Sequence, residues 1–278
     1  MGHVRRAWVV AVAGVLVARV AGAQVPPEQP AQPDETELSR EVENPIGRLR
    51  SIPVQDLTEF GIGPNGLARN TIAIQPILTW SPSEDVSFVS RTRVPIVSTP
   101  DLTMRGGGYT SGLGDMTESL FLVPRSPPGV LWGLGPTFLL PTATANQLGS
   151  GQLGVGPSAA VLTQPRPLTL GVLVGQMWSI AGASNRPDIS QLAIMYFAAL
   201  HFPRGWYLNT MPIVTANWNA ASPRNVWTVP VGGGGGKVFR AGGVPLNVSV
   251  GAYWNAIRPD TVAAPSGSAQ VQVALLLP

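Results

Sequence analysis

The chain has 278 residues, no cysteine, 32 glycines, 28 prolines and only 12% charged residues. Thiol and disulfide chemistry are therefore excluded, and the charge is about half of the roughly 25% typical of a soluble domain. The net charge of +3 disappears if residues 1–23 are removed, because Arg5, Arg6 and Arg19 account for three of the 18 basic residues and 15 then face 15 acidic ones. This balance excludes a charge-driven nucleic-acid partner.

The first 23 residues are typical of a secretory signal peptide. A basic start precedes the apolar run Ala7–Val17 and the small-residue pattern Ala21-Gly22-Ala23, which predicts cleavage after Ala23. A retained membrane anchor is the alternative, but the run is short and Arg19 interrupts its far flank. Residues 24–45 are acidic and Pro-rich with little apolar surface, so we expect a disordered periplasmic tail.

Residues 46–278 contain short segments rich in β-branched and aromatic residues, separated by Gly, Pro, Asn and Asp clusters that are typical of turns. No segment beyond the signal approaches the about 20 apolar residues of a membrane-spanning helix, whereas a membrane-spanning strand needs only about 9–11. We predict about twelve strands, an even number as in outer-membrane barrels. They are Ile52–Phe60, Thr71–Trp80, Val86–Ile96, Leu113–Val123, Val130–Leu140, Gly151–Leu162, Leu168–Ile180, Ile189–His201, Trp206–Asn217, Asn225–Val238, Val244–Trp254 and Ala269–Leu277.

Several of these strands alternate between an apolar face and a small or polar face. Leu168, Leu170, Val172, Val174 and Trp178 share one face in the stretch "LTLGVLVGQMW". A soluble sandwich or lipocalin would turn such a face inward, and a membrane barrel would turn it toward lipid. Prolines at positions 76, 95, 136, 157, 212, 230 and 245 each remove a ladder donor, so we expect bulges or kinks there.

The connections and the tryptophans favour the membrane barrel. Tight connections such as Ser81–Asp85 and Phe202–Gly205 alternate with longer ones such as Val97–Gly112 and Asn255–Ser268, as periplasmic turns alternate with extracellular loops. Tryptophans are predicted at the ends of the strands, where two aromatic girdles would meet the lipid headgroups. The girdle residues are Trp80, Trp132 and Trp206 at the turn side and Trp178, Trp218, Trp227 and Trp254 at the loop side.

Several stretches, taken in order along the chain, resemble a known family. They include "NPIGRLRSIPVQ" (Asn44–Gln55), "FGIGPNGLARNTIAIQPIL" (Phe60–Leu78), "SRTRVPIV" (Ser90–Val97) and "WGLGPTFLLPTAT" (Trp132–Thr144), with "GLGDM" and "GVGPSAAVL" between and after them. The sequence is similar to the phenol-degradation MetA-pathway family of bacterial outer-membrane proteins, which are often labelled transporters or neuromedin U. The resemblance implies an outer-membrane barrel with a role in uptake of small aromatic or hydrophobic compounds.

Charged residues in the predicted strands form the candidate site. Arg91 and Arg93 share one face, and charge at the lipid midplane costs about 2–4 kcal/mol for Arg, so both should point inward. With Asp115 and Glu118 on the next strand they form a predicted lumen charge cluster, either a selectivity site or ion-paired struts. Asp115 and Glu118 are an odd number of positions apart, so a regular strand turns only one of them inward.

Catalysis and metal binding receive no support from the sequence. His201 is the single histidine after signal removal and lies at a predicted turn without an evident partner, which favours a structural role. No Cys or second His is present to build a metal site, and we expect no cofactor. The run Gly232–Gly236 lacks the spacing of a phosphate loop and is predicted to be thin wall, serving as a close-packing surface or a weak point.

The sequence therefore predicts an all-β protein, a closed antiparallel transmembrane barrel in the bacterial outer membrane that is not an enzyme. Its partners would be outer-membrane lipid, lipopolysaccharide and small-molecule solutes, and not nucleic acid. Passive passage of small solutes is the first functional hypothesis. A structural or adhesive barrel with a filled lumen, and a soluble secreted sandwich or lipocalin-like binder, are the alternatives.

Overall fold

The computed structural model describes residues 34–278, apart from 103–107, 126–128, 262 and 278. The predicted signal peptide and residues 24–33 of the predicted tail lie outside the described residues. Among the residues that are described, no helix has the length and apolar character needed to cross a bilayer.

The described chain begins with one α-helix and continues as strands. The helix is α1 (Glu35–Val42), and two short 3₁₀ turns are η1 (Pro203–Gly205) and η2 (Pro223–Asn225). The strands are β1 (Arg50–Ile62), β2 (Leu67–Ile74), β3 (Ile77–Trp80), β4 (Val86–Pro100), β5 (Tyr109–Leu113), β6 (Met116–Pro124), β7 (Val130–Leu140), β8 (Gln152–Thr163), β9 (Leu168–Gly182), β10 (Ser190–His201), β11 (Trp206–Thr210), β12 (Ile213–Asn217), β13 (Trp227–Ala241), β14 (Val244–Ile257) and β15 (Gly267–Leu277).

The strands form one antiparallel sheet that closes on itself. Neighbouring strands pair in chain order, β15 pairs with β1, and β10 pairs with both β9 and the β11–β12 segment, so no open edge remains along this path. Three wall strands are interrupted, between β2 and β3, β5 and β6, and β11 and β12, so the 15 segments make 12 strands of wall. Two of the interruptions fall at Pro76 and Pro212, as expected for residues that cannot donate to the ladder.

The apolar side of the wall faces outward. In β9, Leu170 is 39% exposed while its neighbour Thr169 is completely buried inside, and in β14 Val250 is 58% exposed while Asn247 is buried. A closed sheet satisfies its own backbone groups, which a hydrocarbon environment requires. The predicted closed barrel is confirmed, and the soluble sandwich or lipocalin alternative is wrong, because either would turn these side chains toward its interior.

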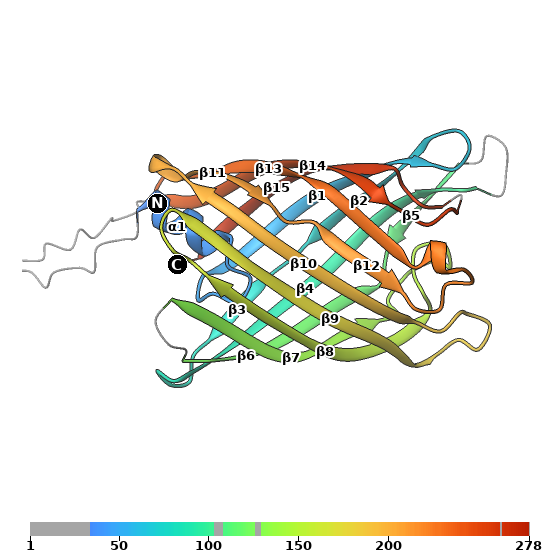
Figure 1. Cartoon of the computed structure of the whole chain (residues 1–278), viewed down its shortest axis with the longest axis horizontal. Coiled ribbons are helices and arrows are strands. Elements are labelled where there is room, and N and C mark those ends of the chain that lie inside the picture. The colour runs from blue at the N-terminus through green and yellow to red at the C-terminus, as the bar shows by residue number, and fades with distance from the viewer. Residues whose placement is uncertain (1–33, 103–107, 126–128, 262, 278) are drawn as a thin grey trace, which may run out of the picture. The chain divides into compact units, whose positions relative to one another are not determined.

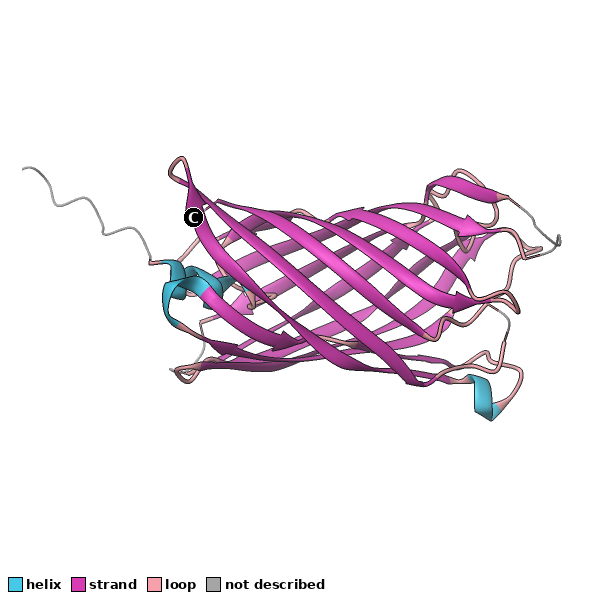
Figure 2. Cartoon of the chain, turned by 90° about the horizontal axis from the view of Figure 1, so that it is seen from above, coloured by secondary structure: helices cyan, strands magenta, loops and turns pink. Residues whose placement is uncertain are grey.

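The strands cross the barrel obliquely, and its two ends differ (Figures 1 and 2). The short turns, α1 and the end of β15 lie at one end, and the longer connections lie at the other (Figure 1). If the fold spans an outer membrane as barrels do, the short-turn end is the periplasmic one. We call the two ends the turn end and the loop end.

One prediction about the tail is wrong for its last part. Residues 34–45 were expected to be disordered, but residues 35–42 form α1 and Leu38, Ser39, Glu43 and Asn44 are buried. The physical reason is that the barrel interior supplies the apolar and polar surface that this segment lacks by itself. The tail segment therefore belongs structurally to the barrel.

Candidate functional site

The segment that precedes β1 closes the turn end of the lumen, and we call residues 34–49 the plug. The Asp34 side chain accepts a hydrogen bond from the Glu37 backbone N–H at 2.7 Å and so caps α1. Glu35 and Glu37 lie in the first turn, where negative charge is favourable. A helix of eight residues is unstable alone, so its stability depends on its contacts inside the barrel.

Apolar contacts fix one face of the plug against the wall. Leu38 is 1% exposed, and Val42 and Leu49 support the cluster in which it lies. A Cβ on Gly236 would lie 2.5 Å from the Tyr207 hydroxyl oxygen, so this glycine leaves room for a tyrosine that contacts the plug. The cluster contains Leu38, Tyr207, Val238, Ala274 and Leu276.

Hydrogen bonds hold the same side of the plug. His201 lies between two hydroxyl groups: its Nδ1 is 3.0 Å from Ser39 Oγ in the plug, and its Nε2 is 3.0 Å from Thr169 Oγ1 in β9. The Arg40 guanidinium donates to the Gln164 carbonyl, and the Gln164 side chain donates to the Arg40 carbonyl at 2.9 Å. His201 therefore links plug and wall, and neither of these ring partners is a carboxylate.

Two carboxyl groups of the plug are affected by burial. Burial raises the pKa of Glu43 to about 7 from the usual 4.5, although the polar side chains of Asn209 and Tyr207 beside it lower the pKa. The Asn209 side chain donates to Glu43 Oε2 at 2.9 Å. Burial, followed by repulsion from Glu37, also raises the pKa of Glu41, against the attraction of Arg40 and Arg48. The plug is thus sensitive to pH at the position of Glu43.

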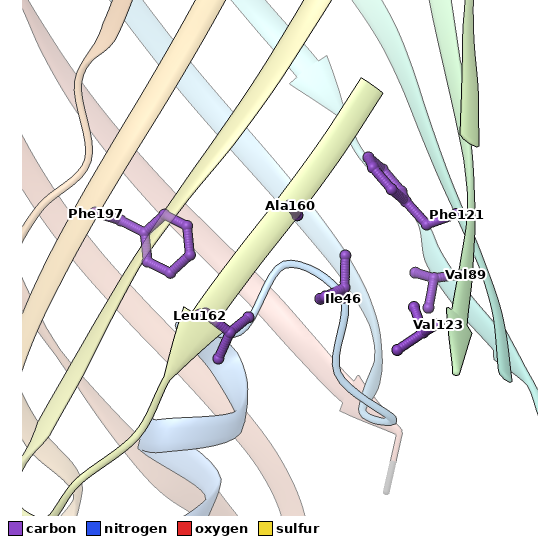
Figure 3. Close-up of a cluster of buried hydrophobic side chains, with 7 residues drawn as sticks. All are labelled: Ile46, Val89, Phe121, Val123, Ala160, Leu162 and Phe197. Atoms are coloured by element: carbon purple, nitrogen blue, oxygen red, sulfur yellow. The ribbon is translucent and has the colours of Figure 1, made fainter. Parts of the chain in front are cut away.

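Near its C-terminal end, the plug makes an apolar contact with the wall of the lumen. Ile46 is 2% exposed and lies between side chains of β8 and β10 and side chains of β4 and β6 (Figure 3). We call this group the floor cluster. It contains Ile46, Val89, Phe121, Val123, Ala160, Leu162 and Phe197, and Ile77, Leu131, Leu173, Met195 and Met211 pack against it.

A cleft separates the plug from the other side of the wall. Its volume is about 420 Å³, and it opens between plug residues such as Glu41 and Ile46 and the turn ends of β4, β6 and β7. Val123 and Leu131 line the wall side, and Glu84, Asp85 and Arg125 line the mouth. We call this space the plug cleft, and Ile46 belongs both to it and to the floor cluster.

The lumen wall above the floor carries paired and unpaired charges. Arg69 Nε lies 2.7 Å from Glu59 Oε2, and the same carboxylate attracts Arg93. Arg91 and Arg93 alternate in step with the inward-facing, buried Ser87 and Val89 of β4, so they share the lumen side. Arg91 Nε is buried and has no hydrogen-bond partner among the residues that the structure describes.

The two predicted acidic partners of these arginines lie elsewhere. Glu118 accepts hydrogen bonds from the Ser90 hydroxyl at 2.6 Å and the Thr92 hydroxyl at 2.5 Å, on the outward face shared with Leu120 and Leu122. Asp115 accepts from the backbone N–H of Ser150 at 2.5 Å and from its hydroxyl at 2.7 Å. The predicted cluster of Arg91, Arg93, Asp115 and Glu118 is therefore not assembled. The spacing of Asp115 and Glu118 allowed only one of them to face inward, and neither contacts the two arginines.

Asp115 instead anchors a loop at the other end of the barrel. The 141–150 segment contains Leu148, which is buried, and the Leu148 carbonyl lies 3.2 Å from the Cβ position of Gly114. Side chains of Pro95 and Val97 meet the same position, so this loop packs on the β4–β6 wall. Arg186 ties the loop to the β9–β10 connection by donating to the Ser150 carbonyl at 3.0 Å.

The predicted girdle tryptophans are all on the surface and close to strand ends. Each of the seven is at least 36% exposed. Trp218 donates from its indole to Gln176 and meets Trp227 edge to face at the loop end. At the turn end, Trp80 stacks on Phe88, and the Lys237 ammonium lies 4.9 Å from the ring centre of Trp206.

Comparison with known proteins identifies the architecture. No family model matches the chain. No curated protein matches it either. Among solved structures, the COG4313 outer membrane channel from Pseudomonas putida F1 is similar with a TM-score of 0.61 and 13% identity, over 82% of this chain and 94% of that chain.

Two other solved barrels align with lower scores. A porin has a TM-score of 0.40 with 9% identity, over 82% of this chain and 99% of that chain. The Pseudomonas putida toluene transporter TodX has a TM-score of 0.35 with 9% identity, over 87% and 91%. Similarity at this level of identity concerns the fold, and the resemblance to the MetA-pathway family stays a prediction. By its fold, this chain is a closed twelve-stranded barrel, and it is similar to the first of these three structures.

Proposed function

We propose that this protein lies in the bacterial outer membrane, after export directed by residues 1–23, and lets small solutes with apolar parts pass through its lumen. The observation that carries the proposal is the plug cleft beside an apolar floor cluster. The outward apolar face and the surface tryptophans support the membrane location. The similar channel from Pseudomonas putida F1 supports a barrel of this type.

The route runs from the loop end to the plug cleft. Ile46 and Val123 separate the lumen from the cleft, since both belong to the floor cluster and both line the cleft. A small movement of the plug on this side opens a continuous path, while the hydrogen bonds of Ser39 and Arg40 on the opposite side stay in place. Apolar solutes suit the narrowest part of this route because the side chains of the floor cluster are apolar, while charged residues line the lumen above it and the mouth of the cleft.

Engineered disulfide cross-links test the route. The chain has no native cysteine, so only the two introduced cysteines can form a disulfide within it. The pair Ile46→Cys/Val123→Cys would close the cleft side, and Ser39→Cys/His201→Cys would fix the hydrogen-bonded side as a matched control. We expect wild-type protein in liposomes to admit small neutral aromatic solutes. Oxidation should reduce this flux for the first pair only, and reductant should restore it.

The alternative is a structural or adhesive barrel whose lumen stays filled. The buried plug and the loop of residues 141–150 are the observations in its favour. Planar-bilayer recordings separate the two functions, because a filled barrel gives neither channel events nor solute flux in liposomes. That result would end the passage proposal and leave the barrel fold untouched.

A further inference from the structure

Arg91 is a lumen-facing cation that no described side chain balances. Its Nε atom is buried and without a partner, and its guanidinium forms no hydrogen bond or ion pair with any residue that the structure describes. Arg69 and Arg93, by contrast, have Glu59 as a counter-charge. Arg91 as a whole is only partly exposed, and a charge with restricted access to water and no partner attracts a counter-ion, so this position points to one from outside the chain.

A chain of hydroxyl groups begins at the cross-strand neighbour of Arg91. Ser119 lies directly opposite Arg91 on β6, where side chains on the same face are about 5 Å apart at Cβ. Thr137 donates its hydroxyl hydrogen to Ser119 Oγ at 2.8 Å, and Ser158 Oγ lies 2.6 Å from Thr137. Thr137 has only one hydrogen to give, so Ser158 donates to it.

The direction of this chain leaves a donor beside the guanidinium. Ser119 accepts from Thr137, and among the described residues no acceptor takes the hydrogen of Ser119. Its O–H and the guanidinium of Arg91 can therefore both donate to one oxyanion. Charge-assisted hydrogen bonds of this kind are the stronger ones in proteins.

Apolar side chains lie one step toward the plug from this pair. Val89 and Phe121 are the next inward residues of β4 and β6, pair across the strands and belong to the floor cluster. Ile77, the cross-strand neighbour of Arg91 on β3, packs against the same cluster. A molecule with one anionic end and an apolar body would place each part against matching surface.

Resting on the proposed passage of apolar solutes, we propose that Arg91 and Ser119 form a binding site for the carboxylate of a small hydrophobic acid, whose apolar body lies on the floor cluster. The charged side chains that face the lumen near Arg91 have a positive balance, which favours binding of an anion. Arg69, Arg91 and Arg93 face the lumen with Glu59 as the paired acid, whereas Glu118 and Asp56 are turned to the outer face, where Asp56 accepts from Asn70 at 2.6 Å. Neutral solutes still pass, but acids are held.

Equilibrium binding to the full mature protein in detergent tests the site, with empty micelles as the blank. Benzoate is the probe and benzamide its neutral analogue of similar shape. We expect wild-type protein to bind benzoate about tenfold or more tightly than benzamide, as a hydrogen-bonded charge requires. Arg91→Gln should remove this preference and leave benzamide binding unchanged.

Matched variants separate a specific site from a general effect of charge. Arg224→Gln removes an exposed cation of η2 at the loop end, away from the plug cleft, and should leave both affinities unchanged. Ser119→Ala should weaken benzoate binding by about two- to tenfold, whereas Thr117→Ala, two positions along the same strand, should not. Arg91→Lys keeps the positive charge and should keep the preference for benzoate over benzamide. If Arg91→Gln does not fold, this variant and Ser119→Ala still test the site.

The outcomes also separate this inference from the proposed passage. A folded Arg91→Gln protein that binds benzoate like wild type, or a wild type that does not distinguish benzoate from benzamide, would overturn the site. Flux of benzamide in liposomes reports on passage independently of the site. If wild-type protein admits no benzamide into liposomes, the passage proposal is wrong, even if the protein binds benzoate.

Discussion

The two sides of the plug are attached to the wall in different ways. Toward β10, β11 and β15, the plug contributes Leu38 to an apolar cluster, Ser39 and Arg40 make hydrogen bonds, and Glu43 accepts one from Asn209. Toward the turn ends of β4, β6 and β7, it is separated from the wall by a cleft of about 420 Å³ and touches it mainly through Ile46. The first side combines several apolar and polar contacts, whereas the second depends on Ile46 and on one buried hydrogen bond, from the Thr79 hydroxyl of β3 to the Gly47 carbonyl at 3.0 Å.

This difference shows how a plug that is not part of the sheet can block the lumen and still allow a path to open along one of its sides. Many contacts on one side fix the position of the plug, so it need not leave the lumen. The contacts on the other side are fewer, so breaking them costs less than releasing the whole plug. The comparison predicts that substitutions on the two sides have different consequences.

The largest effect is expected from Leu38→Ala. Truncation of this buried side chain should cost about 2–5 kcal/mol of docking free energy, because the wall cannot collapse around the space. The whole plug should then leave the lumen, giving a large rise in single-channel conductance and faster protease cleavage within residues 34–49. Thr36→Ala, half-buried on the same helix, is the control, and equal behaviour of the two variants would contradict the comparison.

A smaller effect is expected from Ile46→Ala on the cleft side. The cost should be nearer about 2 kcal/mol, since the adjoining cleft already admits solvent. Conductance should rise, while the backbone amides of α1 keep their hydrogen-exchange protection because the opposite side is untouched. Loss of that protection would mean that Ile46 holds the plug as firmly as Leu38 does.

The last effect is expected from Glu43→Gln, and it appears only as a change in the pH dependence of docking. Because burial raises the pKa of Glu43 from 4.5 to about 7, the docked plug takes up protons more readily than the released one. Docking is then firmest below about pH 4.5 and weakens as pH rises through 7, by on the order of 1–3 kcal/mol. Glu43→Gln should remove most of this slope, as protease cleavage measured from pH 5 to 8 would report.

The wall of the barrel is what the sequence predicts best. The alternation in "LTLGVLVGQMW" and the positions of Trp178 and Trp254 near strand ends predicted an outward apolar face, and the structure has this face. Strand β6 was harder, because Leu120 and Leu122 face outward while Phe121 and Val123 face the plug. Both faces of this half of the strand are apolar, so periodicity there could not show that Glu118 points outward.

The plug helix is the main feature that sequence reasoning missed. The run from Glu35 to Val42 contains only two large apolar residues, Leu38 and Val42, and so it looks like part of a solvated tail. One local signal was present: Asp34 precedes Glu37 by three positions, the spacing of a helix N-terminal cap. That signal indicates where a helix would begin and gives no indication that a barrel interior would stabilise it.

The sequence by itself determined the class of the wall, because a strand repeats every two residues and each strand carries its own pattern. Only the tertiary structure decided what fills the cylinder: which end the plug occupies, that His201 joins it to β9, and that Arg69 has an acidic partner while Arg91 has none in the described part of the chain. These contacts join residues far apart along the chain. Their geometry depends on closure and register, which no local pattern contains.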